Sequence, residues 1–377
     1  MNQAQSFADA LLQGRRGQRM LLEFALASER LSGREGREDS LSAAVFLASY
    51  HLDTGKGSSA VLFGPGAAEA ELTVISLKET ADRLARVPLA AVSSQLMLLC
   101  LSRSVDMARY WQEPDGEDVL AGTEPMREAL GRVAEHVAAS TETVWWRTPV
   151  AERSQWSVQW DDDPPIEMPV EPRDVLVAAR EADVAAEQEA SRQRPKDPAA
   201  SWSGEWWSRP STRIPSSARE LFDGSSAGLW LVEDSLGWEA ATTTRLGIAP
   251  GLRVYEIDTV EAWAELCRRF PLEQTAQKRH DWYRATGRTG RWVVPDWALV
   301  AEHYDGVHLQ VATYLTAAGT AILVDTDTAS VIAGWNPDQT FWFTSNVRHV
   351  DEPVAWRRED EAGEVVWRRA ETSGGDA

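Results

Sequence analysis

Cysteine and lysine are both scarce in this chain of 377 residues. The two cysteines, Cys100 and Cys267, each lie in an apolar stretch with helical spacing, so the sequence predicts neither a disulfide framework nor a cysteine zinc site. Two buried reduced thiols are typical of a cytoplasmic protein. Only four of the 38 basic residues are lysines, and this preference for arginine, together with abundant alanine, indicates a GC-rich bacterial genome.

An excess of positive charge is also absent. The chain has 58 acidic and 38 basic residues, which gives a formal net charge of −20. A surface with this charge repels phosphate backbones and anionic lipids, so we do not expect nucleic acid or a membrane surface as the main partner. The strongest hydrophobic run, LMLLCL at 96–101, is far too short to cross a bilayer, and residues 1–20 do not read as a secretory signal.

Most sequence motifs of catalysis are missing as well. The chain has no H-E-x-x-H, C-x-x-C or EF-hand pattern and no glycine-rich dinucleotide loop, so we predict no metal and no cofactor. Residues 224–228 read GSSAG and match G-x-S-x-G around Ser226. A nucleophile elbow needs a strand before the serine and a helix after it. Here the preceding residues favour a helix and the following ones a strand, so the sequence predicts a surface turn.

Tryptophan, by contrast, is plentiful. The chain has 18 tryptophans beside 8 phenylalanines and 6 tyrosines. Two tryptophan pairs, Trp145–Trp146 and Trp206–Trp207, share the pattern Trp-Trp-x-x-Pro. Tryptophan and arginine contribute most to the free energy of many protein interfaces, so these pairs are candidate partner-binding residues.

The order of patterns along the chain predicts an α+β protein with three segments. Residues 1–160 read mainly as amphipathic helices, and 161–204 form a proline- and acid-rich linker with a possible exposed helix. Residues 205–377 are rich in tryptophan and alternate strands with helices. We expect a mixed or antiparallel sheet there, with a terminal hairpin.

The stretch PDWALVAEHYDGVHLQV at 295–311 holds two of the six histidines. Asp296 is a natural N-cap for a helix that ends near Asp305, and a strand is expected to follow. In that strand His308 points away from Val307, and His303 lies on the helix, so the two histidines are not expected to bind one metal ion. His308 and Asp305 remain as candidate catalytic residues.

A second polar and aromatic cluster, KRHDWYRATGRTGRW, covers 278–292. Guanidinium groups stacked on indole rings form good anion or nucleotide sites. Histidine and aspartate in the same segment add candidate acid–base groups. Trp335 is a candidate for the opposite wall of such a site in the folded chain, so we include it. The candidate residues are His280, Asp281, Trp282, Arg284, Arg288, Arg291, Trp292 and Trp335.

Two functions of different class follow from these patterns. The first is an acidic cytoplasmic interaction protein that binds a protein partner through tryptophan-rich surfaces. The second is a transferase or hydrolase that acts on a phosphorylated or nucleotide-like small molecule at a His/Asp/Arg cleft in the C-terminal part. The first is preferred because each catalytic motif fails in its sequence context, and the sequence leaves open whether the chain is an enzyme.

Overall fold

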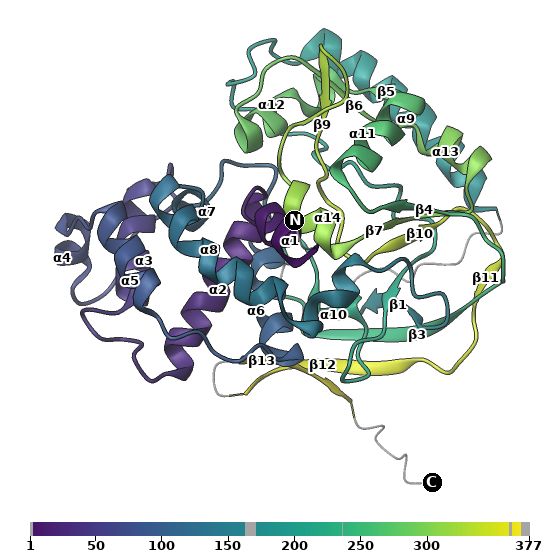
Figure 1. Ribbon diagram of the computed structural model, residues 1–377. Coiled ribbons are helices and arrows are strands. Elements are labelled where there is room, and N and C mark those ends of the chain that lie inside the picture. Colours follow the sequence, from purple (N-terminus) through teal and green to yellow (C-terminus); the bar gives the residue numbers. More distant parts are fainter. Residues whose placement is uncertain (1–2, 163–170, 236, 362–363, 371–377) are drawn as a thin grey trace.

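The computed structural model describes residues 3–162, 171–235, 237–361 and 364–370 (Figure 1). Helices dominate the N-terminal part and strands gather in the C-terminal part, so the predicted α+β class is confirmed. The predicted linker is described only in part, because 163–170 lie outside these ranges.

The N-terminal part consists of helices, several of which begin at side-chain caps. Ser40, Ser76, Ser93 and Asp115 each accept a hydrogen bond from the backbone N–H three residues later, which satisfies an otherwise free donor of the first turn. The elements are α1 (Gln3–Leu11), α2 (Arg15–Leu31), α3 (Leu41–Leu52), α4 (Ala67–Leu72), α5 (Leu77–Arg86), α6 (Ser94–Asp106), α7 (Gly116–Ala121), α8 (Glu124–Ala138) and the 3₁₀ helix η1 (Thr141–Arg147).

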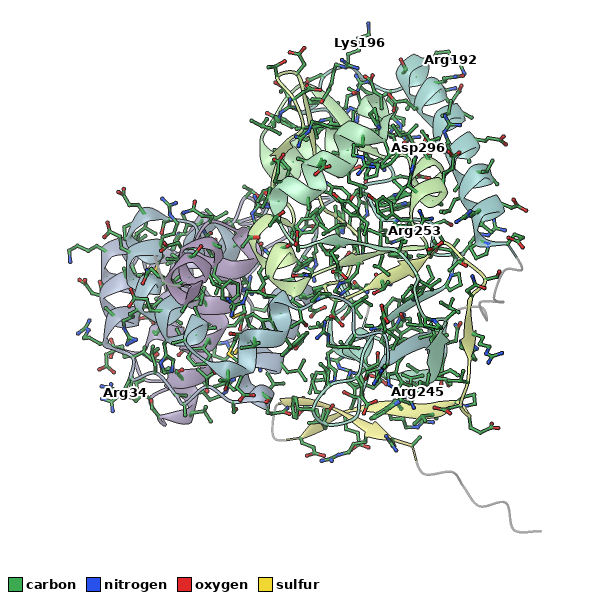
Figure 2. All side chains as sticks on the ribbon, turned by 45° about the vertical axis from the view of Figure 1, so that its right-hand side comes forward. Arg34, Arg192, Lys196, Arg245, Arg253 and Asp296 are labelled. Carbon is green, nitrogen blue, oxygen red and sulfur yellow. The ribbon has the colours of Figure 1, made fainter. Side chains whose placement is uncertain are left out.

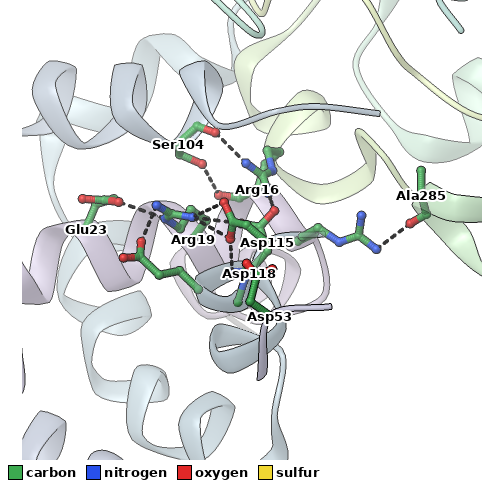
Figure 3. A network of polar contacts seen from close by, with 11 residues as sticks. Arg16, Arg19, Glu23, Asp53, Ser104, Asp115, Asp118 and Ala285 are labelled. Carbon is green, nitrogen blue, oxygen red and sulfur yellow. Dashed lines mark hydrogen bonds and ion pairs between the residues drawn. The ribbon is translucent and has the colours of Figure 1, made fainter. Parts of the chain in front are cut away.

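A buried network of charges joins α2 to its neighbours (Figure 3). Arg16 pairs with the Asp118 carboxylate of α7 and donates to the backbone oxygen of Ser104 at 2.7 Å. One turn later, Arg19 lies 3.2 Å from a carboxylate oxygen of Asp115. Each buried guanidinium therefore has its charge matched, as a group removed from water requires.

The helical part and the sheet part meet at α14 (Val311–Ala317), which contacts α1, α2 and η1. A side chain at Gly14 would place its Cβ 2.1 Å from the backbone oxygen of Leu315. Gly319 has a φ of +70°, and a Cβ there would lie 2.0 Å from the Tyr110 ring. One continuous hydrophobic cluster extends through both parts. The division of the chain into domains stays a prediction.

The larger sheet has the strand order β13-β12-β3-β1-β2-β10-β7-β4, with β11 also paired to β3. Its neighbours are antiparallel except for β4 and β7, which are parallel. β1 comes from the segment before the predicted linker, yet it lies between β2 and β3 of this sheet. The strands are β1 (Gln155–Trp160), β2 (Ser216–Arg219), β3 (Ala240–Ile248), β4 (Val254–Ile257), β7 (Gly306–Leu309), β10 (Thr340–Trp342), β11 (Val347–His349), β12 (Val354–Glu361) and β13 (Glu364–Arg369).

A smaller sheet and the remaining helices complete the C-terminal part. Its strands follow the order β5-β6-β9-β8. The elements are α9 (Pro172–Gln193), α10 (Ala227–Trp230), α11 (Val260–Arg269), β5 (Pro271–Glu273), α12 (Thr275–Thr286), β6 (Arg291–Pro295), α13 (Trp297–His303), β8 (Ile322–Leu323) and β9 (Thr328–Ser330).

Helix α9, from the predicted linker, contacts α12 and α13. The Glu187 carboxylate accepts hydrogen bonds of 2.8 Å from the backbone N–H groups of Ala276 and Gln277, in the first turn of α12. Arg180 donates to Asp296, labelled in Figure 2, at 2.5 Å. The negative charge of Glu187 is favourable at the N-terminus of α12. Polar contacts at two points therefore hold α9 against α12 and α13.

Candidate functional site

His308 lies on β7 between two carboxylates from other elements. Its Nδ1 is 2.7 Å from Oε2 of Glu256 on β4, and its Nε2 is 3.4 Å from Oδ1 of Asp338, which precedes β10. The parallel register of β4 and β7 sets Glu256 directly beside His308. The residue is 1% exposed, so His308 is a buried member of a chain of charges.

The strand that carries His308 is short. β7 ends at Leu309, and the next helix begins at Val311, which therefore does not share a strand face with Val307. All four residues of β7 are buried. Because both faces of this strand are covered, the alternation of side chains does not separate an exposed face from a buried one.

Arg219, at the end of β2, extends the chain of charges towards the surface. Its Nε donates to Oδ1 of Asp338 at 2.6 Å, and its backbone N–H donates to Oδ2 of the same carboxylate at 2.9 Å. A third N–H donates to the hydroxyl of Thr148 at 2.9 Å. The guanidinium carbon is 5.0 Å from the ring centroid of Trp145, the distance of a cation–π contact.

These contacts determine the charge states of the buried groups. Burial by itself lowers the pKa of His308, but its hydrogen bonds to Asp338 and Glu256 outweigh burial and raise that pKa to about 9. Burial by itself raises the pKa of Asp338, but the hydrogen bond from His308 and the charge of Arg219 lower it below its ordinary value. At neutral pH the centre therefore holds a protonated His308 and an ionised Asp338.

A pocket of about 490 Å³ opens beside Arg219, where α6, η1 and the end of β2 meet. We call it the Trp145 groove. Its lining residues are Ser94, Met97, Leu98, Thr141, Glu142, Val144, Trp145, Trp146, Thr148, Arg219, Glu220, Leu221 and Phe222. Its volume falls within the range of about 300–1,000 Å³ that is usual for binding pockets.

The Trp145 groove combines exposed apolar side chains with an acidic rim. Val144 is 50% exposed and Phe222 is 57% exposed. Glu142 bonds to the Ser94 hydroxyl on one wall, and Glu220 lies on the other. The buried carboxylate of Asp338 neutralises the charge of Arg219. The accessible charge of the rim therefore comes mainly from the two glutamates.

The other predicted acid–base residues are not part of this chain of charges. Asp305 accepts a hydrogen bond from the backbone N–H of Arg253 at 3.0 Å and lies 3.5 Å from Arg173 (Arg253 is labelled in Figure 2). His280 and Asp281 are buried on α12. Asp281 accepts hydrogen bonds from the segment that precedes β2. No hydrogen bond or ion pair found between described residues joins these three side chains to His308.

The arginines of the predicted anion site are bound by protein groups. Arg284 donates to Asp281 at 2.5 Å and to two backbone carbonyls. Arg288 donates to two backbone carbonyls and lies over the Trp292 ring at 4.9 Å. Arg291 forms an ion pair with a glutamate of β5. The three guanidinium groups thus have different partners.

The predicted tryptophans differ in accessibility. Trp146, Trp282, Trp292 and Trp335 are buried, whereas Trp145, Trp206 and Trp207 are half-buried. Trp146 packs edge-on against Phe7, and Trp282 donates its indole N–H to the backbone oxygen of Trp206 at 2.7 Å. Trp145 is therefore the predicted tryptophan that combines partial exposure with a place in the pocket described above.

Sequence reasoning missed the residues that surround His308. Glu256 lies 52 residues away in the sequence, and Arg219 lies 119 residues from Asp338, so no local spacing links them. The sequence contained one indication of these residues, the turn pattern Asn336-Pro337-Asp338. Asp338 has a positive φ of 63°, a conformation that aspartate tolerates better than most residues.

The surroundings of Ser226 also differ from expectation. The residues before it form strand β2 and those after it form helix α10, so both elements were predicted wrongly. Strand, turn and helix do follow one another here. However, Ser226 is buried at the N-cap of α10, where its hydroxyl accepts a hydrogen bond from the backbone N–H of Gly228. It therefore serves as a helix cap.

Comparisons with known proteins identify no relative: no family model, no curated protein and no solved structure matches the chain. Among the described helices, none has the length and apolar composition needed to cross a membrane. In the described ranges, no group of three or more His, Cys, Asp or Glu side chains is arranged to hold a metal ion.

Proposed function

We propose that this protein is a cytoplasmic binding protein that holds a short segment of a protein partner in the Trp145 groove. The exposed side chains of Val144 and Phe222 beside the Trp145 ring carry this proposal. Apolar groups that stay exposed around a pocket lose their contact with water when an apolar anchor enters. Aromatic side chains in such pockets contribute strongly to binding.

The charges favour a partner segment that is basic next to its apolar anchor. Glu142 and Glu220 line the groove, and the whole chain carries a net charge of −20. Complementary charge increases the rate of association and disfavours wrong partners. A segment with a leucine, methionine or phenylalanine beside lysine or arginine therefore fits the groove best.

The enzyme alternative has weaker support. Catalysis by His308 requires one of its ring nitrogens to reach a substrate, but both face carboxylates and the residue is 1% exposed. Arg219, the member of this chain of charges that lines the groove, is already bound to Asp338. The His308 centre is better explained as support for the wall of the groove.

The test is fluorescence anisotropy with labelled ten-residue peptides that carry one leucine or phenylalanine flanked either by lysines or by glutamates. We expect the lysine peptides to bind more tightly, and Phe222→Ala to weaken their binding about tenfold. Phe63→Ala is the matched control, because Phe63 is 89% exposed and lies outside the groove.

Equal binding of the lysine and glutamate peptides, or equal losses in the Phe222 and Phe63 variants, would contradict the proposal. Sedimentation of the unliganded protein provides a further check. If the chain self-associates and Phe222→Ala abolishes the association, the occupant of the groove is a second copy of the chain.

A further inference from the structure

A second pocket, of about 260 Å³, lies where α6 faces the C-terminal strands β12 and β13. We call it the tryptophan pocket. Three of its lining residues are Trp160, Trp238 and Trp367. The rings of Trp160 and Trp238 are stacked, with centroids 4.7 Å apart and planes inclined by 23°. Trp367 lies tilted beside Trp160 at 5.8 Å.

Two arginines reach the same pocket from different elements. Arg103 comes from α6, and Arg358 comes from β12, directly opposite Trp367 in the hairpin register. Residues opposite each other in an antiparallel pair point to the same face, so Arg358 and Trp367 share a side of the hairpin. In the described part of the chain, no hydrogen bond or ion pair involves the side chain of either arginine.

The charged residues that line the pocket give it a net charge of about one positive charge, whereas the whole protein has a net charge of −20. One acidic side chain, Asp106, also lines the pocket, and its Oδ1 accepts a hydrogen bond from the backbone N–H of Ser235 at 3.1 Å. Two guanidinium groups beside one carboxylate attract an anion. They repel the quaternary or primary ammonium group that tryptophan cages otherwise bind.

We propose that the tryptophan pocket binds a small aromatic anion, a flat ring that carries one carboxylate or phosphate. The ring stacks on the accessible indole surface of Trp160 and Trp238, as aromatic pairs do at 4.5–7 Å. The anionic group takes N–H donors from Arg103 and Arg358, whose fork geometry matches carboxylate and phosphate oxygens. The volume lies slightly below the usual range for drug-sized ligands, which favours one or two fused rings.

The test is isothermal titration calorimetry with two sets of matched probes. The first set is indole-3-carboxylate, indole and tryptamine, which share a ring and differ in charge. The second set is adenosine 5′-monophosphate and adenosine. We expect the anion of at least one set to bind about tenfold or more tightly than its neutral or cationic analogues. Whichever anion binds identifies the group as carboxylate or phosphate.

Variants locate the site. Arg103→Gln and Arg358→Gln are each expected to weaken binding of the anion about tenfold. Arg357→Gln is the matched control, because Arg357 is exposed on the same strand and does not line the pocket. Phe222→Ala, in the Trp145 groove, should leave binding unchanged. Arg358 is exposed, so its variant is expected to fold even if the Arg103 variant does not.

A second measurement reports directly on the rings. In ¹H–¹⁵N spectra, the bound anion should shift the indole N–H signals of Trp160 and Trp238, assigned through Trp160→Phe and Trp238→Phe variants. The proposal is overturned if neither anion binds, if neither anion binds more tightly than the neutral or cationic analogues of its own set, or if Arg357→Gln weakens binding as much as Arg358→Gln.

Discussion

Replacing Glu233 with glutamine is expected to stabilise the protein by about 3 kcal/mol at pH 7 and to leave its stability nearly unchanged at pH 4.5. Glu233 follows α10 and is 8% exposed. Neither of its carboxylate oxygens receives a hydrogen bond of good geometry from a described residue. Burial raises its pKa from 4.5 to about 8, and Tyr314 and Arg16 offset this only in part.

The direction of the pKa shift determines how Glu233 changes the stability of the fold with pH. A carboxyl group whose pKa is higher in the folded state adds no penalty below the unfolded value, near pH 4.5. Its penalty grows as the pH rises to about 8, because the unfolded chain releases the proton more readily. Glutamine is neutral at every pH, so the variant should lack this loss of stability between pH 4.5 and 8.

The free energy of unfolding, measured with urea between pH 4.5 and 8, tests this prediction. Glu239→Gln is the control, since Glu239 is an exposed glutamate of the same segment. A Glu233→Gln variant whose unfolding free energy runs parallel to that of the original protein over this range would show that Glu233 ionises normally.

Replacing Asp338 with asparagine is expected to destabilise the protein by about 3–5 kcal/mol at pH 7. Asparagine tolerates the positive φ of this position, so the change removes charge with little strain. The Asp338 carboxylate accepts hydrogen bonds from Arg219 and contacts protonated His308. Without it, the buried Arg219 guanidinium loses its carboxylate partner, and His308 retains only that of Glu256.

This variant should also change the pH dependence above neutrality. The pKa of His308 in the folded state, about 9, lies above its ordinary value of 6.5. Its stabilising contribution is therefore complete below about pH 6.5 and is lost as the pH rises through 9. Since Asp338 is the largest source of the upward shift, Asp338→Asn should lose less stability than the original protein between pH 6.5 and 9.

Urea unfolding from pH 6 to 9.5 measures both effects, and the histidine resonances in NMR spectra report the pKa of His308 directly. Asp82→Asn is the control, because its ion pair with Lys78 is exposed and should contribute little. A loss for Asp338→Asn no greater than that for Asp82→Asn would mean that the buried centre does not stabilise the fold.

The helices could be predicted well where caps and apolar periodicity agree. Asp296 was predicted as an N-cap, and its side chain accepts a hydrogen bond from the backbone N–H of Leu299 at the start of α13. The prediction failed around Ser226, where small residues form β2 and the apolar residues Leu229 and Trp230 belong to α10. Short segments of this kind take the structure that their neighbours impose, since β propensity depends on pairing and burial.

The candidate site was predictable only in part. His308 was identified as unusual because histidines are rare in the chain, and Trp145 because it forms a pair. Their connection through Asp338 and Arg219 joins segments far apart in sequence, and no periodicity encodes it. The arginines of 284–291 were predicted to form an anion site because the sequence does not show the carbonyl and carboxylate groups that bind them in the folded chain.

The amino-acid sequence alone determined the fold class, the position of many helices and the acidic charge, because these depend on local patterning and composition. The tertiary structure decided which tryptophans remain accessible, which arginines are already neutralised and which carboxylates meet His308. These properties arise when sheet pairing and helix packing bring together groups from distant segments, and burial then changes their charge states.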